Sequence, residues 1–468
     1  MANLDAIVLA ADPRSRLRIG GLTARERAIR VAGRVGATRV FVVDRIGPVG
    51  AAPSTLVRAH AGDGAHEAER PQLDAGATAE LGAWRGASAA PLLVIRADQL
   101  VHPPLVEPLV AAAPALRADG VAVAVANAAG AAGVPPGDHG YGGAFLATGT
   151  AAAAALAQLA AGTADAAIVD ALPGTARVDV PYRGVARAAI GTAAERRSAH
   201  RLLYQILVKP QDNAITRYLY RPVSLPLTRL LVWTPVTPNQ VSLAVAVIVA
   251  VGCWLTARAS ATSALVGTVV VLAASYLDCC DGEIARVKLT SSKLGAWLDT
   301  VIDELSSIAY IAALGWHCHL AYDPRYPWVT ATIVGAVVNA WAMYCVYFNI
   351  IVGVGSANSQ DYAGRFTVRP GEAPDTVRLA PIAQAIAPSA SRPRWLEWAA
   401  TYLPYIARRD FLSWMAVALT AVHAAHVLFV IFTVGTLVMT TVLTVDHLWL
   451  RRLRRSVERG GKRMLPAR

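Results

Sequence analysis

Two long stretches of this chain contain no charged residue, and they restrict its possible folds more than any other feature. Residues 241–255 and 427–445 are dominated by Val, Leu and other apolar residues. A helix needs about 20 mostly apolar residues to cross the hydrocarbon core of a bilayer. These two stretches, extended by their apolar neighbours, therefore predict helices that span a membrane.

Further apolar segments of this kind fill the second half of the sequence. They predict six membrane spans, the last two almost continuous near His426, at residues 237–257, 262–281, 297–316, 328–353, 410–426 and 428–449. Basic residues follow the second, fourth and sixth spans, and such residues mark the cytosolic side of a membrane. We therefore expect an integral protein of the cytoplasmic membrane with both termini in the cytosol.

The formal net charge of +12 is better explained by membrane lipids than by nucleic acid as a partner. Arginines gather beside the apolar runs, as within residues 451–455, where anionic lipid headgroups would contact them. Nucleic acid is therefore not an expected partner. The five cysteines show no paired zinc-ligand spacing, so neither a zinc site nor a disulfide framework is predicted.

The first 200 residues have a different pattern, in which short apolar segments alternate with helical ones. Residues 4–10 and 38–43 are expected to form strands, with a helix at residues 23–35 between them. This alternation is typical of an α/β domain with a parallel sheet. The predicted order is a cytosolic α/β domain, a linker with an amphipathic juxtamembrane helix, a six-helix membrane domain and a basic cytosolic tail, at residues 1–199, 200–236, 237–450 and 451–468.

Four aspartates, Asp278, Asp281, Asp299 and Asp303, lie at the ends of two of the predicted membrane helices. A carboxylate at membrane depth costs a few kcal/mol or more, so its default interpretation is functional, with a compensating cation nearby. A solvated position in a cytosolic loop would explain any one of these residues, but not the pattern of all four. Oxygen ligands select hard cations such as Mg²⁺ or Mn²⁺, and four carboxylates can hold two ions.

The spacing of these residues places them on two helix faces. Along the first helix, one face carries Asp278, Asp281, Gly282, Ala285 and Arg286. Along the next helix, steps of four residues form a stripe of Gly295, Asp299 and Asp303. If the two faces meet, the four carboxylates converge among small residues.

The pattern D-x2-D-G-x2-A-R-x8-G-x3-D-x3-D resembles the signature of the CDP-alcohol phosphotransferase family, and every defining position is present. The resemblance implies transfer of a substituted phosphate group from a CDP-linked donor to an alcohol, release of CMP, and usually a homodimer. It implies that Asp303 is the catalytic base and that all four aspartates bind metal. The small residues would form the bed for the cytidine nucleotide, while Arg286 would contact a phosphate or pair with the carboxylates.

Flanking polar residues have two interpretations each. Asn239 and Gln240, before the first span, resemble the family's first-helix entry and would face the nucleotide, but they are equally typical of a helix N-terminus. Arg217, Arg221 and Lys293 lie near the predicted cytosolic surface. They would bind a phosphorylated acceptor or, alternatively, lipid headgroups.

The N-terminal domain resembles the nucleotidyltransferase half of fused inositol-phosphate cytidylyltransferase/di-inositol-phosphate phosphate synthase, through residues 6–11 and the linker at residues 217–224. A working domain of that type needs a Gly-rich turn and a nearby Lys to bind the triphosphate. Here the turn contains Pro13, Arg14 and Arg16, and no lysine precedes Lys209. We therefore expect a catalytically degenerate domain, although Asp98 occupies a plausible metal position and either arginine could replace the lysine.

The sequence accordingly predicts phosphotransfer from CDP-diacylglycerol to an alcohol or phosphorylated polyol in phospholipid biosynthesis. An active N-terminal domain would instead give a bifunctional cytidylyltransferase and inositol-phosphate phosphotransferase that uses a soluble CDP-alcohol. A cation transporter is the alternative of another class, because intramembrane carboxylates also bind permeating ions. A sensing or scaffolding role for the N-terminal domain is a further alternative.

Overall fold

The computed structural model describes residues 3–44, 65–68, 75–116, 119–131, 140–171, 177–208, 212, 214–356, 361–371, 373, 375–382 and 409–467. The chain forms two compact units. The first unit comprises residues 1–209, 232–234 and 286–289, and the second comprises residues 210–231, 235–285 and 290–468.

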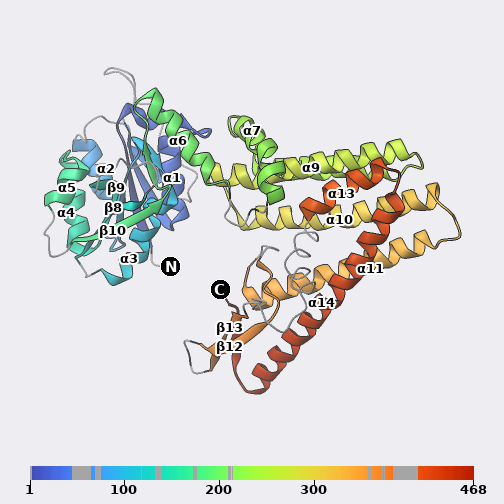
Figure 1. Ribbon diagram of the computed structural model, residues 1–468. Coiled ribbons are helices and arrows are strands. Elements are labelled where there is room, and N and C mark those ends of the chain that lie inside the picture. Colours follow the sequence, from blue (N-terminus) through green and yellow to red (C-terminus); the bar gives the residue numbers. More distant parts are fainter. Residues whose placement is uncertain are drawn as a thin grey trace. The chain divides into compact units, whose positions relative to one another are not determined.

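A seven-stranded sheet forms the centre of the first unit (Figure 1). Its spatial order is β10 (Arg177–Gly184), β8 (Val121–Ala131), β9 (Tyr141–Ala147), β6 (Leu92–Arg96), β1 (Leu4–Ala10), β4 (Ala37–Asp44) and β5 (Ala65–Ala68). All neighbours run parallel except β9, which is antiparallel to both β6 and β8.

The prediction of a parallel sheet is therefore wrong for β9. Only residues 132–140 separate β8 from β9, and a parallel connection needs a crossover of a dozen or more residues. β8 extends to Ala131, and residues 132–139 lie outside the described part of the chain.

Helices and short strands complete the first unit. They are α1 (Ala24–Arg34), α2 (Ala75–Arg85), α3 (Glu107–Ala112), α4 (Gly149–Ala160), α5 (Asp165–Ala171), α6 (Ala193–Gln205), β2 (Arg18–Ile19), β3 (Leu22–Thr23), β7 (Gln99–Val101), β11 (Arg187–Ala189), and the 3₁₀ turns η1 (Pro13–Arg16), η2 (Pro103–Leu105) and η3 (Ala113–Ala115). α1 begins with a capping box, in which Thr23 and Glu26 satisfy backbone donors of the first turn.

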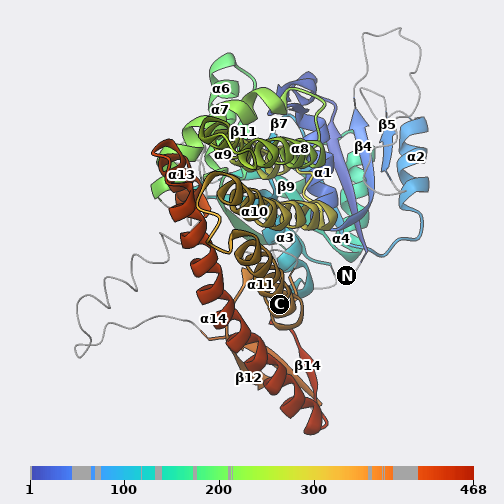
Figure 2. The ribbon, with the colours of Figure 1, turned by 90° about the vertical axis from the view of Figure 1, so that its right-hand side faces the viewer.

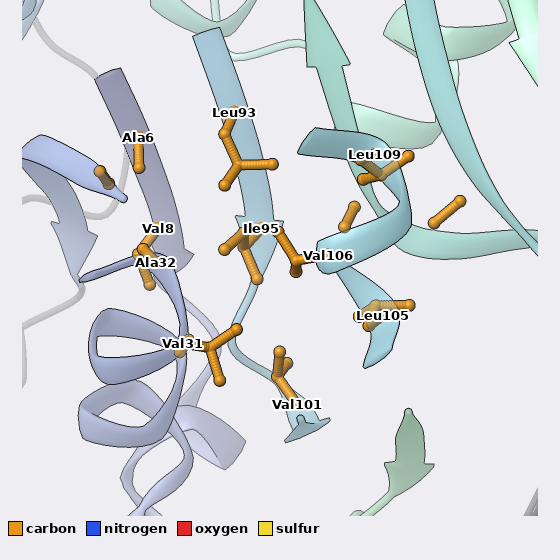
Figure 3. Packing of buried hydrophobic residues seen from close by; sticks show 14 of the residues in the cluster. Ala6, Val8, Val31, Ala32, Leu93, Ile95, Val101, Leu105, Val106 and Leu109 are labelled. Carbon is orange, nitrogen blue, oxygen red and sulfur yellow. The ribbon is translucent and has the colours of Figure 1, made fainter. Parts of the chain in front are cut away.

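The core of the first unit lies between this sheet and the helices that cover it. Val31 and Ala32 of α1 lie over Val8 of β1 and Ile95 of β6, and all four are buried (Figure 3). On the same face, Leu105, Val106 and Leu109 extend the cluster. Because both faces of β1 and β6 are covered, residues 6–10 and 92–95 of these strands form unbroken apolar runs, as expected for the centre of an α/β sheet.

The second unit consists mainly of long helices (Figure 1). They are η4 (Thr216–Tyr220), α7 (Arg221–Val232), α8 (Pro238–Thr256), α9 (Ala261–Val287), α10 (Lys293–Ala321), α11 (Trp328–Phe348), η5 (Asn349–Val354), α13 (Arg409–Ala421) and α14 (Ala425–Arg459), of which η4 and η5 are π-helical. α8 and α9 approach closely where glycines meet, because a Cβ on Gly267 would lie 2.5 Å from the carbonyl oxygen of Gly252.

Four of the described helical segments are long and apolar enough to cross a membrane: Pro238–Thr256, Ala261–Val287, Trp328–Val354 and Ala425–Arg459. The prediction of six spans is thus not confirmed for the third and fifth segments. α10 contains Asp299, Asp303 and Glu304 in its first half, and α13 has only 13 residues, short of the roughly 20 that a span needs. The break expected near His426 falls one turn earlier, where His423 has a φ of 59°.

A small three-stranded sheet lies near the end of α14, where Figure 2 labels β12 and β14. It consists of β12 (Phe366–Pro370), β13 (Thr376–Pro381) and β14 (Arg463–Leu465), with β14 parallel to β13. Phe366 and Leu379 pack against Leu450 of α14. The sequence predicts a basic tail at residues 451–468, whereas α14 continues to Arg459 and the following residues add a strand to this sheet.

Candidate functional site

Three carboxylates converge where α9 ends and α10 begins. Asp278 of α9 and Asp299 and Asp303 of α10 each offer an oxygen, and these three oxygens lie within 4.8 Å of one another. All three side chains are half-buried. We call this group the carboxylate cluster. Its donor set contains only oxygen, which is the chemistry that suits Mg²⁺ or Mn²⁺.

Local helix geometry explains why the two α10 residues point the same way. Ser292 caps α10, and its hydroxyl accepts a hydrogen bond from the backbone N–H of Gly295 at 3.0 Å. From that start, Asp299 and Asp303 follow at steps of four residues and lie one above the other on one face. The spacing in the sequence was therefore sufficient to predict this part of the cluster.

Asp281 does not belong to the group of three. Its side chain is 6% exposed, and its Oδ2 accepts a hydrogen bond from the hydroxyl of Ser242 at 2.5 Å. Ser242 lies in the first turns of α8, also buried. In the sequence, Ser242 closes the polar segment at residues 237–242 that resembles the family's first-helix entry, but its hydrogen bond to Asp281 was not predicted.

The small signature residues lie near these carboxylates along the two helices. Gly282 and Ala285 are half-buried on α9, and Arg286 is half-buried in its last turn. A Cβ on Gly295 would lie 3.1 Å from the side-chain oxygen of Asn239, so α8 and α10 approach closely at this glycine.

Asn239 and Gln240 have different surroundings. Asn239 lies beside Gly295, as its contact distance shows. Gln240 forms a capping box with Thr237, because its side-chain oxygen accepts the backbone N–H of Thr237 at 2.9 Å. The contacts of Gln240 are therefore those of a residue at a helix N-terminus, which was one of its two interpretations from the sequence.

The three basic residues expected to bind an acceptor phosphate are also dissimilar. Arg217 and Lys293 are exposed. Arg221 is only 7% exposed, and its guanidinium contacts the carboxylates of Asp212 and Glu283. Its donors are directed at these two partners, so Arg221 does not match the expectation of an acceptor-phosphate contact.

Glu283 is the buried residue that sequence reasoning missed. It is 0% exposed and accepts hydrogen bonds from Arg221, from Ser224 at 2.9 Å and from Thr228 at 2.5 Å. Glu283 belongs to the same helix as Asp278 and Asp281 but is not a defining position of the signature. A buried charge of this kind needs a partner elsewhere in the chain, which a single sequence does not identify.

A chamber of about 740 Å³ adjoins the carboxylate cluster. Asp278 and Asp303 form part of its wall, together with Ser306, Ser307 and Asn339. The remaining wall is mainly apolar and comes from α8, α9, α10, α13 and α14. The chamber therefore joins a charged end to a hydrocarbon-like interior.

The first unit contains a second acidic site, but its contacts differ. Asp98 follows β6 and is 8% exposed. Its carboxylate accepts hydrogen bonds from Arg14 at 3.1 Å and from Arg96 at 2.5 Å. Arg14 also pairs with Asp12, and its hydrogen bond lowers the pKa of that carboxyl. Arg16 is exposed. Two guanidinium groups thus contact the carboxylate that the sequence suggested as a metal ligand.

Solved structures similar to the chain include two sugar- or polyol-phosphate nucleotidyltransferases by title. A putative glucose-1-phosphate thymidylyltransferase from Bacillus anthracis is 15% identical with a TM-score of 0.31, covering 42% of this chain and 94% of its own. The inositol-1-phosphate CTP transferase from T. maritima is 12% identical with a TM-score of 0.29, covering 43% and 97%.

Curated relatives match by sequence over shorter segments. A "Bifunctional IPC transferase and DIPP synthase" from Aquifex aeolicus is 34% identical over 131 residues, 28% of this chain and 29% of the relative. Proteins of the same name from Thermococcus kodakarensis and Archaeoglobus fulgidus are 32% and 30% identical, over 30% and 38% of this chain. The match spans about a third or less of the length of each relative.

A family model described as CDP-alcohol phosphatidyltransferase matches residues 235–422. This segment contains the whole signature and all members of the carboxylate cluster. The match and the relatives confirm the resemblance drawn from the signature, and the chain therefore contains a domain of the CDP-alcohol phosphatidyltransferase family, a family of transferases.

Proposed function

We propose that this protein is a metal-dependent CDP-alcohol phosphotransferase that moves a substituted phosphate group from a CDP-linked donor to an alcohol and releases CMP. The observation that carries the proposal is the carboxylate cluster of Asp278, Asp299 and Asp303, held within a domain of a transferase family. The transporter interpretation accounts for the carboxylates but not for that family match.

Mg²⁺ or Mn²⁺ fits the cluster because all three donors are carboxylate oxygens. When bound there, the metal would neutralise the diphosphate of the donor and stabilise CMP as it leaves. Asp278, Asp299 and Asp303 would hold it. Asp281 is also a predicted metal ligand. The binding of two ions by the four aspartates is a prediction as well.

Asp303 is the proposed general base. It accepts the proton of the attacking hydroxyl, whose oxygen forms a bond to the β-phosphorus of the donor. The bond from that phosphorus to the bridging oxygen of CMP breaks, and CMP leaves with the electron pair. Gly282, Ala285 and Gly295 leave room for the nucleotide beside the cluster, and Arg286 contacts a phosphate.

The relatives favour the alternative donor of the sequence analysis over CDP-diacylglycerol. Their printed name combines an IPC transferase with a DIPP synthase, which corresponds to a soluble CDP-alcohol and a phosphorylated polyol. We therefore propose CDP-inositol as the donor class and inositol phosphate as the acceptor class. The basic residues Arg217 and Lys293, both exposed, are the proposed contacts of the acceptor phosphate.

CDP-diacylglycerol is a second candidate donor because of one observation. The chamber beside Asp278 and Asp303 is mainly apolar and has about 740 Å³, enough for hydrocarbon beside a charged headgroup. A soluble CDP-alcohol has no group that would fill this space. The structure of the chamber and the names of the relatives thus point to different donors, which an experiment can separate.

The test supplies purified protein in nanodiscs with Mg²⁺ or Mn²⁺ and one radiolabelled donor at a time. CMP formation from CDP-inositol with inositol phosphate supports the main proposal, and a labelled lipid product from CDP-diacylglycerol supports the second candidate. If neither donor yields CMP with any phosphorylated polyol, the proposed function is wrong. Asp323→Asn, which changes a half-buried carboxylate paired with Arg325, is the matched control for Asp303→Asn.

Cytosolic termini and a homodimer remain predictions about this protein. Cysteine labelling of the two ends from either side of sealed vesicles tests the first. Light scattering of the detergent-solubilised protein tests the second.

A further inference from the structure

α7 has its polar side turned toward the protein and its apolar side turned outward. Arg221, Ser224 and Thr228 follow at steps of three and four residues, so they share one face, and all three are buried. Val223 and Leu230 are 48% and 70% exposed. This arrangement suits a helix whose outer side contacts lipid, as the sequence predicted for the juxtamembrane segment.

The buried face of α7 converges on one carboxylate of α9. Arg221 and Ser224 donate to Oε1 of Glu283, and Thr228 donates to Oε2. Asp212 accepts a further hydrogen bond from Arg221 at 2.8 Å. The thiol of Cys280 lies 3.7 Å from the carbonyl oxygen of Ser224 and adds a second point of contact between the helices. Both oxygens of Glu283 are therefore satisfied by α7.

Glu283 lies on the opposite side of α9 from Asp278 and Asp281. It follows Asp281 by two residues and Asp278 by five, and at 3.6 residues per turn these steps point it away from both. A rotation of α9 would move Asp278 out of the carboxylate cluster and pull Glu283 from its partners on α7. The two faces of α9 are thus mechanically linked.

We propose that Glu283 is a positioning residue, which uses its buried contacts with α7 to fix the rotation of α9 and hence the place of Asp278 in the carboxylate cluster. This inference depends on one part of the proposed function, namely that the carboxylate cluster binds the metal. A merely structural role predicts lower stability of Glu283 variants without a change in metal affinity. A positioning role predicts weaker metal binding by protein that is still folded.

The experiment uses the full chain in phosphatidylcholine nanodiscs and measures Mn²⁺ binding by EPR titration. Glu283→Gln keeps the shape of the side chain but removes its charge, and we expect Mn²⁺ affinity to fall roughly 10-fold or more. Glu283→Asp, which keeps the charge, should retain more affinity. Glu458→Gln is the matched control, because Glu458 also pairs with an arginine, Arg454, but far along α14 at an exposed position.

A double-mutant cycle sharpens the assignment. Glu283→Gln and Arg221→Gln act on one contact, so their combined effect on Mn²⁺ affinity should be much smaller than the product of the two single effects. Folded Glu283→Gln protein with wild-type Mn²⁺ affinity overturns the proposal. If that variant is not recovered folded, Thr228→Val decides by the same criterion, since it removes one hydrogen bond and leaves the ion pair.

The outcomes also separate this proposal from the proposed function. Wild-type protein that binds Mn²⁺ but forms no CMP from either donor would refute the transferase activity. The variants would still show whether Glu283 controls the metal site, because EPR measures binding without turnover.

Discussion

The two units each place an aspartate where the sequence suggested a metal ligand, but the surroundings of these carboxylates differ. In the first unit, Arg14 and Arg96 donate hydrogen bonds to Asp98. In the second unit, Asp278 has Asp299 and Asp303 as neighbours, with oxygens within 4.8 Å. A guanidinium satisfies a carboxylate, whereas gathered carboxylates repel one another and favour a cation between them.

The position of an acidic residue at the end of a strand or helix therefore does not by itself define a metal site. The charge of its neighbours does. By this criterion the second unit is the expected metal-binding and catalytic part of the protein, and the first unit is expected to lack metal-dependent catalysis. The following predictions test that division.

The largest effect is expected at the proposed base. Asp303→Asn should lower the rate of CMP formation by roughly 10²–10⁴-fold, because the attacking hydroxyl loses the group that accepts its proton. Initial rates with CDP-inositol or CDP-diacylglycerol, whichever is the substrate, measure the loss. Asp323→Asn should match the wild type. Equal rates for Asp303→Asn and Asp323→Asn would remove Asp303 from the mechanism.

A buried carboxylate that pairs with arginines should contribute to the free energy of unfolding and not to catalysis. Asp5 is 1% exposed and pairs with Arg39 and Arg85, so Asp5→Asn should destabilise the first unit by about 3–5 kcal/mol. Thermal unfolding of the full chain, followed by near-UV circular dichroism, measures this. Asp179→Asn changes an exposed partner of Arg177; it is the control and should change the unfolding temperature little.

The contacts of Asp5 with Arg39 and Arg85 also predict how the stability of the first unit changes with pH. Burial raises the pKa of Asp5, but hydrogen bonds from Arg39 and Ser88 and the charges of Arg39 and Arg85 outweigh it, so the pKa is lowered. The stabilisation is therefore fully present above the unfolded pKa of about 3.9 and is lost as the pH falls through the folded value. In Asp5→Asn, the unfolding temperature should therefore depend less on pH in this range than in the wild type. An unchanged pH dependence of the unfolding temperature would contradict this.

Metal binding should distinguish the two acidic sites directly. Asp299→Asn should weaken Mn²⁺ binding at least about 10-fold in an EPR titration, since it removes a proposed ligand. Asp98→Asn should leave the titration unchanged, because Arg14 and Arg96 already satisfy that carboxylate. A loss of bound Mn²⁺ in Asp98→Asn would show that the first unit also binds metal and would contradict the assignment of the metal site to the second unit alone.

The smallest signal is expected in a test of cytidylyltransferase activity by the first unit. Full-length protein with CTP, inositol phosphate and Mg²⁺ should release no pyrophosphate above background, in which case the donor is made by another enzyme. Pyrophosphate release that disappears in Asp98→Asn would instead show a bifunctional protein, as the names of its relatives suggest.

Features governed by near neighbours in the chain were predictable. The predicted strands at residues 4–10 and 38–43 correspond to β1 and β4, and the predicted helix at residues 23–35 to α1. The stripe of Asp299 and Asp303 follows from the helical repeat alone. The four longest apolar segments are also recognisable, because hydrophobic length is a local property.

Features that depend on distant partners were not predictable. Asp281 was expected to lie with the other three aspartates, but it lies outside that group and contacts Ser242, 39 residues away; its role as a metal ligand stays a prediction. Arg221 was expected to contact an acceptor phosphate or a lipid headgroup, but its guanidinium donates to Glu283, 62 residues away. The same holds for Arg14, which was considered as a substitute for the missing lysine and instead contacts Asp98, 84 residues away.

Carboxylates on neighbouring faces of two helices in an apolar region were predictable from residues close in the chain, because helix periodicity and hydrophobic length are local properties. Which carboxylates contact one another, and which contact an arginine or a serine, depends on tertiary packing. These contacts depend on the packing of α7 and α8 against α9, and of β6 beside the turn at Pro13–Arg16, where a buried charge takes whichever partner the fold brings within reach.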